Sequence, residues 1–523
     1  MSRRHWIAAP ILAVISIGLA GCTPPRTAAP PPPPPHLGPI EAPEDLVGEM
    51  LVRDPLALFE TVAHAAAMKD LDPLALLDDP SFAAVSKLID LHGSVAVAVL
   101  GDPRHTDSLH VTGAMRLKNP KEARAQLADA TAKGKFKATE SPAIRSKIYV
   151  AGKSNLALIG ETLVFADAVA TLESAGRWIG KETEGTPPHE VSVRVPLSRW
   201  SGQLKAEAKS FVDAELQKDP SSASFEPVMR TIVDLVGDLG DVQLSLDLEK
   251  EDAVVDFRLG ATGGFSSWLG KFPAGTPRSI LTLPRGSGAL VVRLPDAVSD
   301  TVKALFDADA KKGPAKKEFE DARTFARAIG HEIALVYAQK PRPGESPKTT
   351  EVMTRIELVD PNGAKSAIKS LLADWVGKPD RKVVRGPWAK NGADGESLQI
   401  TDGNEKYDVR WAIKGNSLFI DAAWEGKVTL IDAAVDPNAK SLLGNDVRAK
   451  SFAEKLPKEG LALAYYAQTP VAPKVEELGA VPALEGIRWG WVSAAKTGVA
   501  SQWNLPIADL ATYFKPHGEK AAP

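Results

Sequence analysis

The chain has 523 residues, of which 44% are hydrophobic and 25% are charged, and its formal net charge is −3. These proportions are typical of a globular body, and they exclude a disordered chain, a collagen and a protein with many membrane spans. The near-balance of charge excludes nucleic acid as the main partner, because phosphate binding needs a concentrated face of lysine and arginine. The length predicts two or more domains.

The first residues have the pattern of a secretory signal. Arg3 and Arg4 form a positive head, and a mostly apolar run from Trp6 to Leu19 follows them. Such a run is too short to remain as a membrane-spanning helix, so we expect residues 1–21 to be a signal peptide that is removed. The chain has one cysteine, Cys22, which excludes a disulfide scaffold and a cysteine-ligated zinc protein.

The residues around the expected cleavage point are Leu19-Ala20-Gly21-Cys22. They resemble the lipobox of bacterial lipoproteins at all four positions. The resemblance implies that a diacylglyceryl group is transferred to the thiol of Cys22, that the chain is cut before Cys22, and that the new amine is acylated. Two or three acyl chains make a stable anchor, so the lipid bilayer is the expected partner of this end. Thr23 stands where an aspartate would imply retention at the inner membrane, which favours the outer membrane of the cell envelope.

The route of export stays open. Arg3-Arg4, followed by Trp6 and Ile7, also resembles a twin-arginine export signal, which carries folded proteins. An ordinary charged head of a general secretory signal accounts for the same residues and is favoured.

Residues 22–43 comprise the lipidated cysteine and a proline-rich spacer, with six prolines from Pro30 to Pro35. Proline lacks a backbone N–H and has a fixed φ, so this stretch cannot join a helix or a sheet. We expect a polyproline II strut with a rise of about 3.1 Å per residue. Its simplest role is to hold a folded domain away from a lipid surface.

The body contains a repeated pattern, Val-Arg-x-Pro, whose arginines are Arg53, Arg194 and Arg293. Each copy precedes a helix-like stretch, and proline suits the first turn of a helix. Two further helices have matching starts at Asn119-Pro120 and Asp360-Pro361, where a side-chain oxygen precedes proline. The arginines could line an anionic groove, but pairing with local carboxylates is the favoured interpretation.

The order and spacing of such motifs predict a duplicated chain. Pro55 and Pro295 have nearly the same separation as Pro120 and Pro361, and the longer separation of Asp167 and Asp421 is expected from one insertion in the stretch 386–405. We therefore expect a first α+β half at 44–285, a second at 286–515 and a tail at 516–523. Short strands joined by turns favour antiparallel meanders, so the expected fold class is α+β, with duplicated units of antiparallel sheet and helices packed on one face.

Only weak signs of catalysis are present. Ser-x-x-Lys occurs at Ser366–Lys369 and at Ser493–Lys496, and the second copy runs into Lys496-Thr497-Gly498. These motifs resemble the serine acyl-transfer enzymes of the envelope, in which the lysine activates the serine. The third motif of those enzymes, Ser-x-Asn, is missing between Ser366 and Lys496, so a non-enzymatic protein is favoured.

Two other patterns have a functional and a structural interpretation. Trp489 and Trp491 share one face of a predicted strand and Trp503 lies on the next, so they could stack on the sugar rings of a glycan such as peptidoglycan. Burial in a core is the favoured alternative. Three histidines and two aspartates gather near one predicted hairpin, but their spacing matches no standard metal pattern, so no metal and no cofactor is expected. They are His92, His105, His110, Asp102 and Asp107.

The sequence thus predicts a membrane-anchored envelope lipoprotein whose body is a non-enzymatic binding or structural module. Its partner in the envelope could be another protein, a lipid or a glycan. The two alternatives are a Ser-x-x-Lys acyl-transfer enzyme and a peptidoglycan-binding module.

Overall fold

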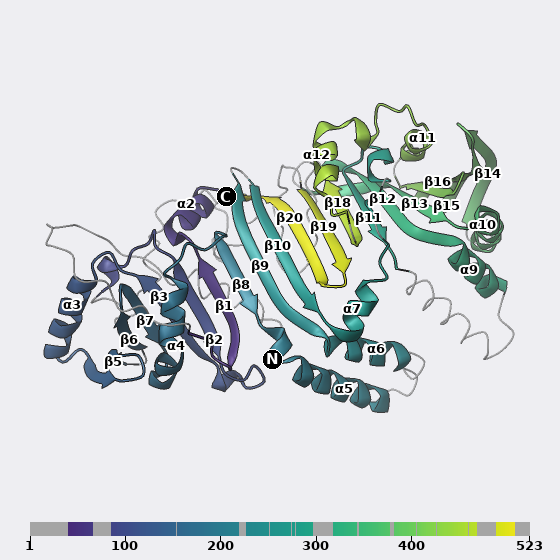
Figure 1. Ribbon diagram of the computed structural model, residues 1–523. Helices are drawn as coiled ribbons and strands as arrows, with labels where there is room; N and C mark the ends of the chain where they lie inside the picture. The colour runs from purple at the N-terminus through teal and green to yellow at the C-terminus, as the bar shows by residue number, and fades with distance from the viewer. Residues whose placement is uncertain are drawn as a thin grey trace. The chain divides into compact units, whose positions relative to one another are not determined.

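The structure is a computed structural model of the chain. It describes residues 40–65, 85–152, 154–218, 226–249, 252–273, 275–277, 279–295, 317–342, 345–376, 381–403, 405–424, 426–458, 460–467 and 488–507. Antiparallel strands predominate and helices accompany them, so the fold class is α+β (Figure 1). Cys22, most of the proline-rich spacer, the helix expected after Pro295 and the tail lie outside the described residues.

The chain forms two compact units. The first comprises residues 1–202, 240–257 and 507–523, and the second comprises 203–239 and 258–506. These units differ from the halves 44–285 and 286–515 expected from the sequence, because residues 203–239 and 258–285 belong to the second unit.

The strands that follow one another from residue 46 to 261 are joined in the order β10-β9-β8-β1-β2-β3-β7-β6-β5-β4. Their bounds are Leu46–Val52 (β1), Val95–Leu100 (β2), His110–Arg116 (β3), Lys137–Ser141 (β4), Ser146–Ala151 (β5), Ser154–Ile159 (β6), Thr162–Ala166 (β7), Val191–Val195 (β8), Leu239–Glu249 (β9) and Asp252–Ala261 (β10). The helices are Pro55–Ala65 (α2), Pro120–Ala132 (α3), Val169–Glu182 (α4), Ser201–Lys218 (α5), Glu226–Val236 (α6) and Gly263–Leu269 (α7).

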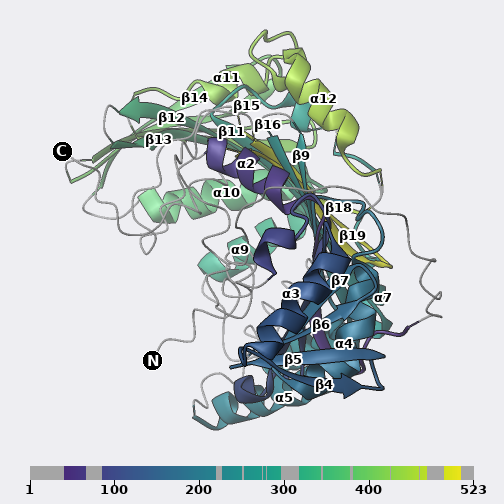
Figure 2. The same ribbon diagram turned by 90° about the vertical axis from the view of Figure 1, so that its left-hand side faces the viewer.

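Helices α3 and α4 lie on opposite faces of the sheet of the first unit. Alternate residues of a strand point to opposite faces, and the two core clusters divide β7 in this way. Leu163 packs with Leu127 of α3, whereas Val164 packs with Leu172 of α4. The sheet therefore lies between the two helices (Figure 2), and the expectation of helices on one face is wrong for this unit because both faces of its strands are apolar.

The strands from residue 288 to 506 are joined in the order β20-β19-β18-β11-β12-β13-β17-β16-β15-β14. Their bounds are Gly288–Arg293 (β11), Ile329–Arg342 (β12), Glu345–Leu358 (β13), Arg381–Lys390 (β14), Ala393–Asp402 (β15), Glu405–Lys414 (β16), Ser417–Ala423 (β17), Leu461–Ala467 (β18), Arg488–Ala495 (β19) and Gly498–Pro506 (β20). The helices are Lys317–Ala328 (α9), Pro361–Val376 (α10), Leu430–Ala434 (α11) and Val447–Lys455 (α12).

The second unit also has helices on both faces of its sheet. On β17, Leu418 packs in a cluster with Ile368 of α10, and its neighbour Phe419 packs in a cluster with Ile431 of α11. Figure 1 shows α11 and α12 above these strands and α9 below them. The one-face arrangement expected from the sequence is therefore wrong here for the same reason.

The two sets of ten strands have the same order when each strand of the first is matched with the strand ten places later. The predicted helix starts agree with this match. Asn119 Oδ1 accepts a hydrogen bond from the N–H of Glu122 (3.2 Å) at the start of α3, and Asp360 Oδ1 accepts one from the N–H of Gly363 (2.9 Å) at the start of α10. Each side chain caps a helix whose first residue is proline.

One expected correspondence is shifted by a residue. Phe165 packs on the α3 face of its sheet, whereas Phe419 packs on the α11 face of the other. The match between Asp167 and Asp421 is shifted in the same way: Asp167 is exposed, and Asp421 is fully buried. A shift of one residue reverses the facing of every side chain in a strand, so these aspartates are not equivalent.

Candidate functional site

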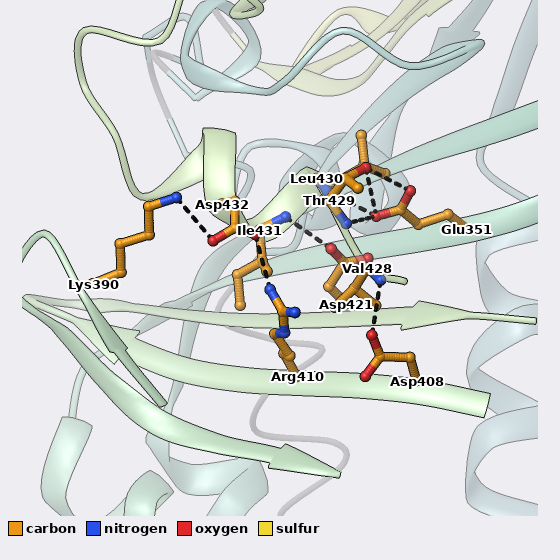
Figure 3. Close-up of polar contacts among 10 residues, drawn as sticks. All are labelled: Glu351, Lys390, Asp408, Arg410, Asp421, Val428, Thr429, Leu430, Ile431 and Asp432. Atoms are coloured by element: carbon orange, nitrogen blue, oxygen red, sulfur yellow. Dashed lines mark hydrogen bonds and ion pairs between the residues drawn. The ribbon is translucent and has the colours of Figure 1, made fainter. Parts of the chain in front are cut away.

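Three buried carboxylates from three neighbouring strands form a polar site inside the second unit (Figure 3). Glu351 comes from β13, Asp408 from β16 and Asp421 from β17. Glu351 and Asp408 are each 8% exposed and Asp421 is 0% exposed. Buried carboxylates are costly unless they are hydrogen-bonded or paired, so their partners define what the site can do.

The strand register brings these residues together. Glu351 and Asp408 both lie opposite Ala423, one on each side of β17. Asp421 is two residues before Ala423 and therefore lies on the same face of the sheet. This is the face that α11 covers, and Ile431 of that helix is fully buried against it.

The three carboxylates accept hydrogen bonds from four consecutive backbone N–H groups at the start of α11. Val428 donates to Asp408 Oδ2 (3.1 Å), Ile431 donates to Asp421 Oδ2 (2.8 Å), and Thr429 and Leu430 both donate to Glu351 Oε1 (2.8 Å for Leu430). The hydroxyl of Thr429 donates to Glu351 Oε2 (2.9 Å). The first N–H groups of a helix have no partner within it, so the sheet provides them with acceptors. A hydrogen bond to a charged group contributes about 1.5–3 kcal/mol.

The environment of Asp421 disfavours its charge. Burial, followed by the nearby charge of Glu351, raises the pKa of Asp421 to about 8, against the opposing effects of the Ile431 N–H and Arg410. Asp421 Oδ1 has no hydrogen-bond donor among the described residues. The raised pKa favours the protonated form of Asp421 near neutral pH.

Two ion pairs also connect α11 to the sheet beside the three carboxylates. Asp432 of α11 pairs with Lys390 of β14 (2.9 Å) and with Arg410 of β16 (2.8 Å). These contacts tie α11 to two further strands. We call this arrangement the clamp on α11. Its carboxylate oxygens accept hydrogen bonds from backbone N–H groups, and its ion pairs connect α11 to the sheet.

The part of the chain that the structure describes contains no group of three or more histidine, cysteine, aspartate or glutamate side chains that could hold a metal ion. Two of the histidines noted in the sequence pair with separate aspartates. His92 Nδ1 lies 3.1 Å from Asp54 Oδ2, and His110 Nδ1 lies 3.2 Å from Asp167 Oδ1.

The three repeated arginines pair locally with carboxylates. Arg53 pairs with Glu190, Arg293 lies 3.8 Å from Glu332, and Arg194 lies 3.1 Å from Asp241 and 3.6 Å from Glu49. Each guanidinium thus has an anionic neighbour within its own sheet. Such pairing neutralises the positive charge that an anion-binding groove would use.

The two Ser-x-x-Lys motifs lie in different settings. Ser366 and Lys369 are both exposed on α10. Ser493 is 8% exposed on β19, with Oγ 3.5 Å from the carbonyl oxygen of Ala500, and Lys496 is in the turn before β20. The second pair is therefore not on a helix, where a spacing of three residues would bring the two side chains together.

The three tryptophans do not form one platform. Trp489 is 8% exposed and its ring centroid lies 5.5 Å from that of Phe452, in the core beneath α12; Trp491 packs at the edge of that core. Trp503 lies opposite Gly490, so it points to the other face of the sheet. This arrangement agrees with the favoured interpretation of core packing for Trp489, and Trp503 lies on the opposite face from the other two tryptophans.

A second surface of the same sheet is apolar and partly exposed. On the face opposite α11 and α12, paired residues of β12, β11, β18, β19 and β20 form cross-strand rows. One row is Leu335, Leu290, Tyr465, Gly490 and Trp503, and the next is Ile333, Val292, Leu463, Val492 and Ser501. Every apolar residue of these rows is partly exposed. Ile333 packs against the core cluster that contains Ile368 of α10, and the other apolar residues of these rows belong to no core cluster of the described residues.

The equivalent strands of the first unit have the same kind of face. Val97, Met50, Val193 and Leu244 form one row across β2, β1, β8 and β9, and Val95, Val52, Val191 and Leu246 form the next. Most of these side chains are partly exposed, and they lie opposite the face that α4 covers. The apolar rows therefore recur in both units.

Sequence reasoning missed both surfaces. An acidic residue within an otherwise apolar strand, as in Leu418-Phe419-Ile420-Asp421-Ala422, was the available signal for the clamp. For the apolar rows, the signal was strands with apolar residues on both faces, such as Ala289–Val292. Cys22 lies outside the described residues, so its lipidation stays a prediction.

Comparison with known proteins assigns no family. No family model and no curated protein matches the chain. Among solved structures, crystal form IV of a protein called TP0453 matches with a TM-score of 0.22 at 9% identity over 41% of this chain and 76% of that chain. Crystal form I of the same protein matches with a TM-score of 0.22 at 10% identity over 43% and 79%. Among the described helices, none has the length and hydrophobicity needed to span a bilayer.

Proposed function

We propose that this protein is a lipid-anchored lipoprotein of the bacterial envelope, and that its body is a non-enzymatic module that binds the acyl chains of a lipid. The anchor rests on Leu19-Ala20-Gly21-Cys22 and the charged, apolar leader before it. The proline-rich spacer would then hold the body clear of the membrane surface. The outer membrane is the favoured location because of Thr23.

The observation that carries the binding role is the set of apolar cross-strand rows. A sheet in water normally buries its apolar face or carries polar residues on it, and contiguous exposed apolar surface marks a binding site. In the second unit the rows are mostly aliphatic, and they include Leu290, Leu335 and Leu463. An acyl chain matches such a surface because it is apolar and has no hydrogen-bonding group to satisfy.

The recurrence of these rows supports a binding role over incidental exposure. Val193 and Leu244 of the first unit occupy strands equivalent to those of Tyr465 and Gly490 in the second. We further infer that the two sets of ten strands arose by duplication, since their strand orders agree and the capped starts of α3 and α10 correspond.

The test is cross-linking of the acylated, full-length protein in vesicles of phosphatidylethanolamine that contain a lipid with a photoreactive acyl chain. We expect adducts on the apolar rows, and we expect Leu463→Asp to reduce them at least several-fold, because a buried carboxylate opposes contact with an acyl chain. Val384→Asp is the matched control, since Val384 is 67% exposed on β14, outside the rows. Equal labelling of the two variants would contradict the proposal.

A further inference from the structure

The Glu351–Asp421 pair has a feature that helix capping alone does not need. Glu351 already accepts hydrogen bonds from Thr429 and Leu430, and Asp421 Oδ2 accepts one from Ile431. Asp421 Oδ1, in contrast, has no hydrogen-bond donor among the described residues, although Asp421 is fully buried. A buried oxygen without a donor is costly, and a proton shared with the adjacent Glu351 removes that cost.

We propose that Glu351 and Asp421 share one proton, and that this proton latches the segment 428–431 and helix α11 onto the sheet. With the proton in place, the pair carries one negative charge and all of its contacts are favourable. Without it, two adjacent buried carboxylates repel each other, and the closed arrangement is destabilised. The fold thus contains a pH-sensitive device that is independent of the proposed lipid binding.

The other charged groups around the pair do not replace the proton. From β16, Asp408 adds a further negative charge and is engaged by the Val428 N–H. Arg410 of β16 and Lys390 of β14 are both directed at Asp432 of α11. On β13, the Arg355 guanidinium lies 5.8 Å from the Phe419 ring and donates to the Thr282 and Ser417 hydroxyls.

Burial and the charge of Glu351 raise the pKa of Asp421 to about 8, which agrees with a retained proton at neutral pH. If α11 lifts off, the Asp421 carboxyl reaches water and its pKa returns to about 4. The closed form therefore binds one more proton than the open form between these two values, so opening becomes easier as the pH rises through this range. Above about pH 8 both forms are ionised and the effect levels off.

Opening would change the core as well as the latch. Leu430 and Ile431 are buried in the same cluster as Val291 and Phe419. Release of α11 would expose this apolar surface to water. Loss of the shared proton would therefore weaken the packing of α11 against one face of the sheet in the second unit.

The test is hydrogen exchange of the full-length protein, followed at the amides of residues 428–431. We expect their protection factors to fall by about tenfold per pH unit between about pH 5 and pH 7, and to level off above about pH 8. In Asp421→Asn, whose side-chain amide can donate to Glu351 and accept from Ile431 without ionising, we expect protection that does not change with pH. Asp432→Asn is the matched control and should keep the pH dependence of the original chain.

Protection factors that stay constant with pH in the original chain would overturn the proposal, as would an equal fall in Asp421→Asn. Difference infrared spectroscopy gives a second measurement on the unaltered side chains. We expect the band of a buried protonated carboxyl to disappear as the pH rises from about 6 to about 9, and to be missing in Asp421→Asn. A band that persists in the variant would also refute the assignment.

Discussion

The ammonium nitrogen of Lys455 lies 4.7 Å from the ring centroid of Trp489. Lys455 is at the end of α12, and the indole beneath it packs against Phe452 and Tyr466 in the core. The lysine therefore covers the indole from outside, which a ring that stacks on a sugar would not allow.

We predict that Trp489→Ala lowers the free energy of unfolding by about 3–5 kcal/mol, because it removes a large side chain from a packed core. Lys455→Met should cost about 0.5–1 kcal/mol, the value of an exposed cation–π contact. Urea unfolding measures both changes. A Trp489→Ala variant as stable as the original chain, with reduced sedimentation on purified peptidoglycan, would instead favour the glycan-binding alternative.

Gly490 leaves room for the ring of Trp503, and this predicts a large effect of one methyl group. A Cβ added at Gly490 would lie 2.2 Å from Cε3 of Trp503. Gly490→Ala should therefore lower the free energy of unfolding by about 1–3 kcal/mol through overpacking. In the background of Trp503→Leu the same substitution should cost less, and a double-mutant cycle from urea unfolding measures the difference.

The matched control for this prediction is Gly386→Ala on β14. A Cβ at Gly386 would meet no atom within 4 Å, so this substitution should be neutral or stabilise the protein by about 0.5–1 kcal/mol. Equal costs at Gly490 and Gly386 would show that the Trp503 ring does not lie over Gly490.

The raised pKa of Asp421 also predicts the pH dependence of global stability. The folded state holds a proton on this carboxyl up to about pH 8, and the unfolded state loses it near pH 3.8. The contribution of this group therefore falls by about 1.4 kcal/mol per pH unit as the pH rises between these values. Asp421→Asn should remove this slope and be the more stable form at pH 8, as measured by urea unfolding at several pH values. Parallel stability curves for the two proteins would contradict the prediction.

For the anchor, we predict that Cys22→Ser abolishes the incorporation of labelled palmitate and leaves an uncleaved precursor. The reason is that Cys22 is the single thiol in the chain, so the modification has no other sulfur to use. Thr23→Asp is the control: it should keep the label and move the protein to the inner membrane. Palmitate labelling of Cys22→Ser at the original level would exclude the lipobox interpretation.

Local patterns predicted much of the fold. The strand Val95–Leu100 and the caps Asn119 and Asp360 are as expected, because alternation and capping are set by neighbours along the chain. The face of the sheet to which each side chain points was harder to predict. The one-residue offset between Phe165 and Phe419 arises from strands that are apolar on both sides, where periodicity does not say which residues point to which helix.

The candidate site depends on contacts that are distant in the sequence. Glu351 and Asp421 are far apart along the chain and meet because β13 pairs with β17 in a particular register. A sequence pattern can mark Asp421 as unusual in an apolar strand, but it does not identify the partner strand. The sequence likewise does not show that Trp503 and Trp489 lie on opposite faces of the sheet, because the register of β19 with β20 decides which residues share a face.

Finally, the outermost strands β4 and β14 bear on how neighbouring copies meet. Each pairs with one strand only among the described elements, so each has a free row of backbone groups. Four of the five residues of β4 are exposed and two of these are charged, and β14 carries Pro387, which has no N–H to offer. Charged side chains and proline oppose the addition of a foreign strand. Copies that are crowded together should therefore remain separate instead of polymerising through their sheets.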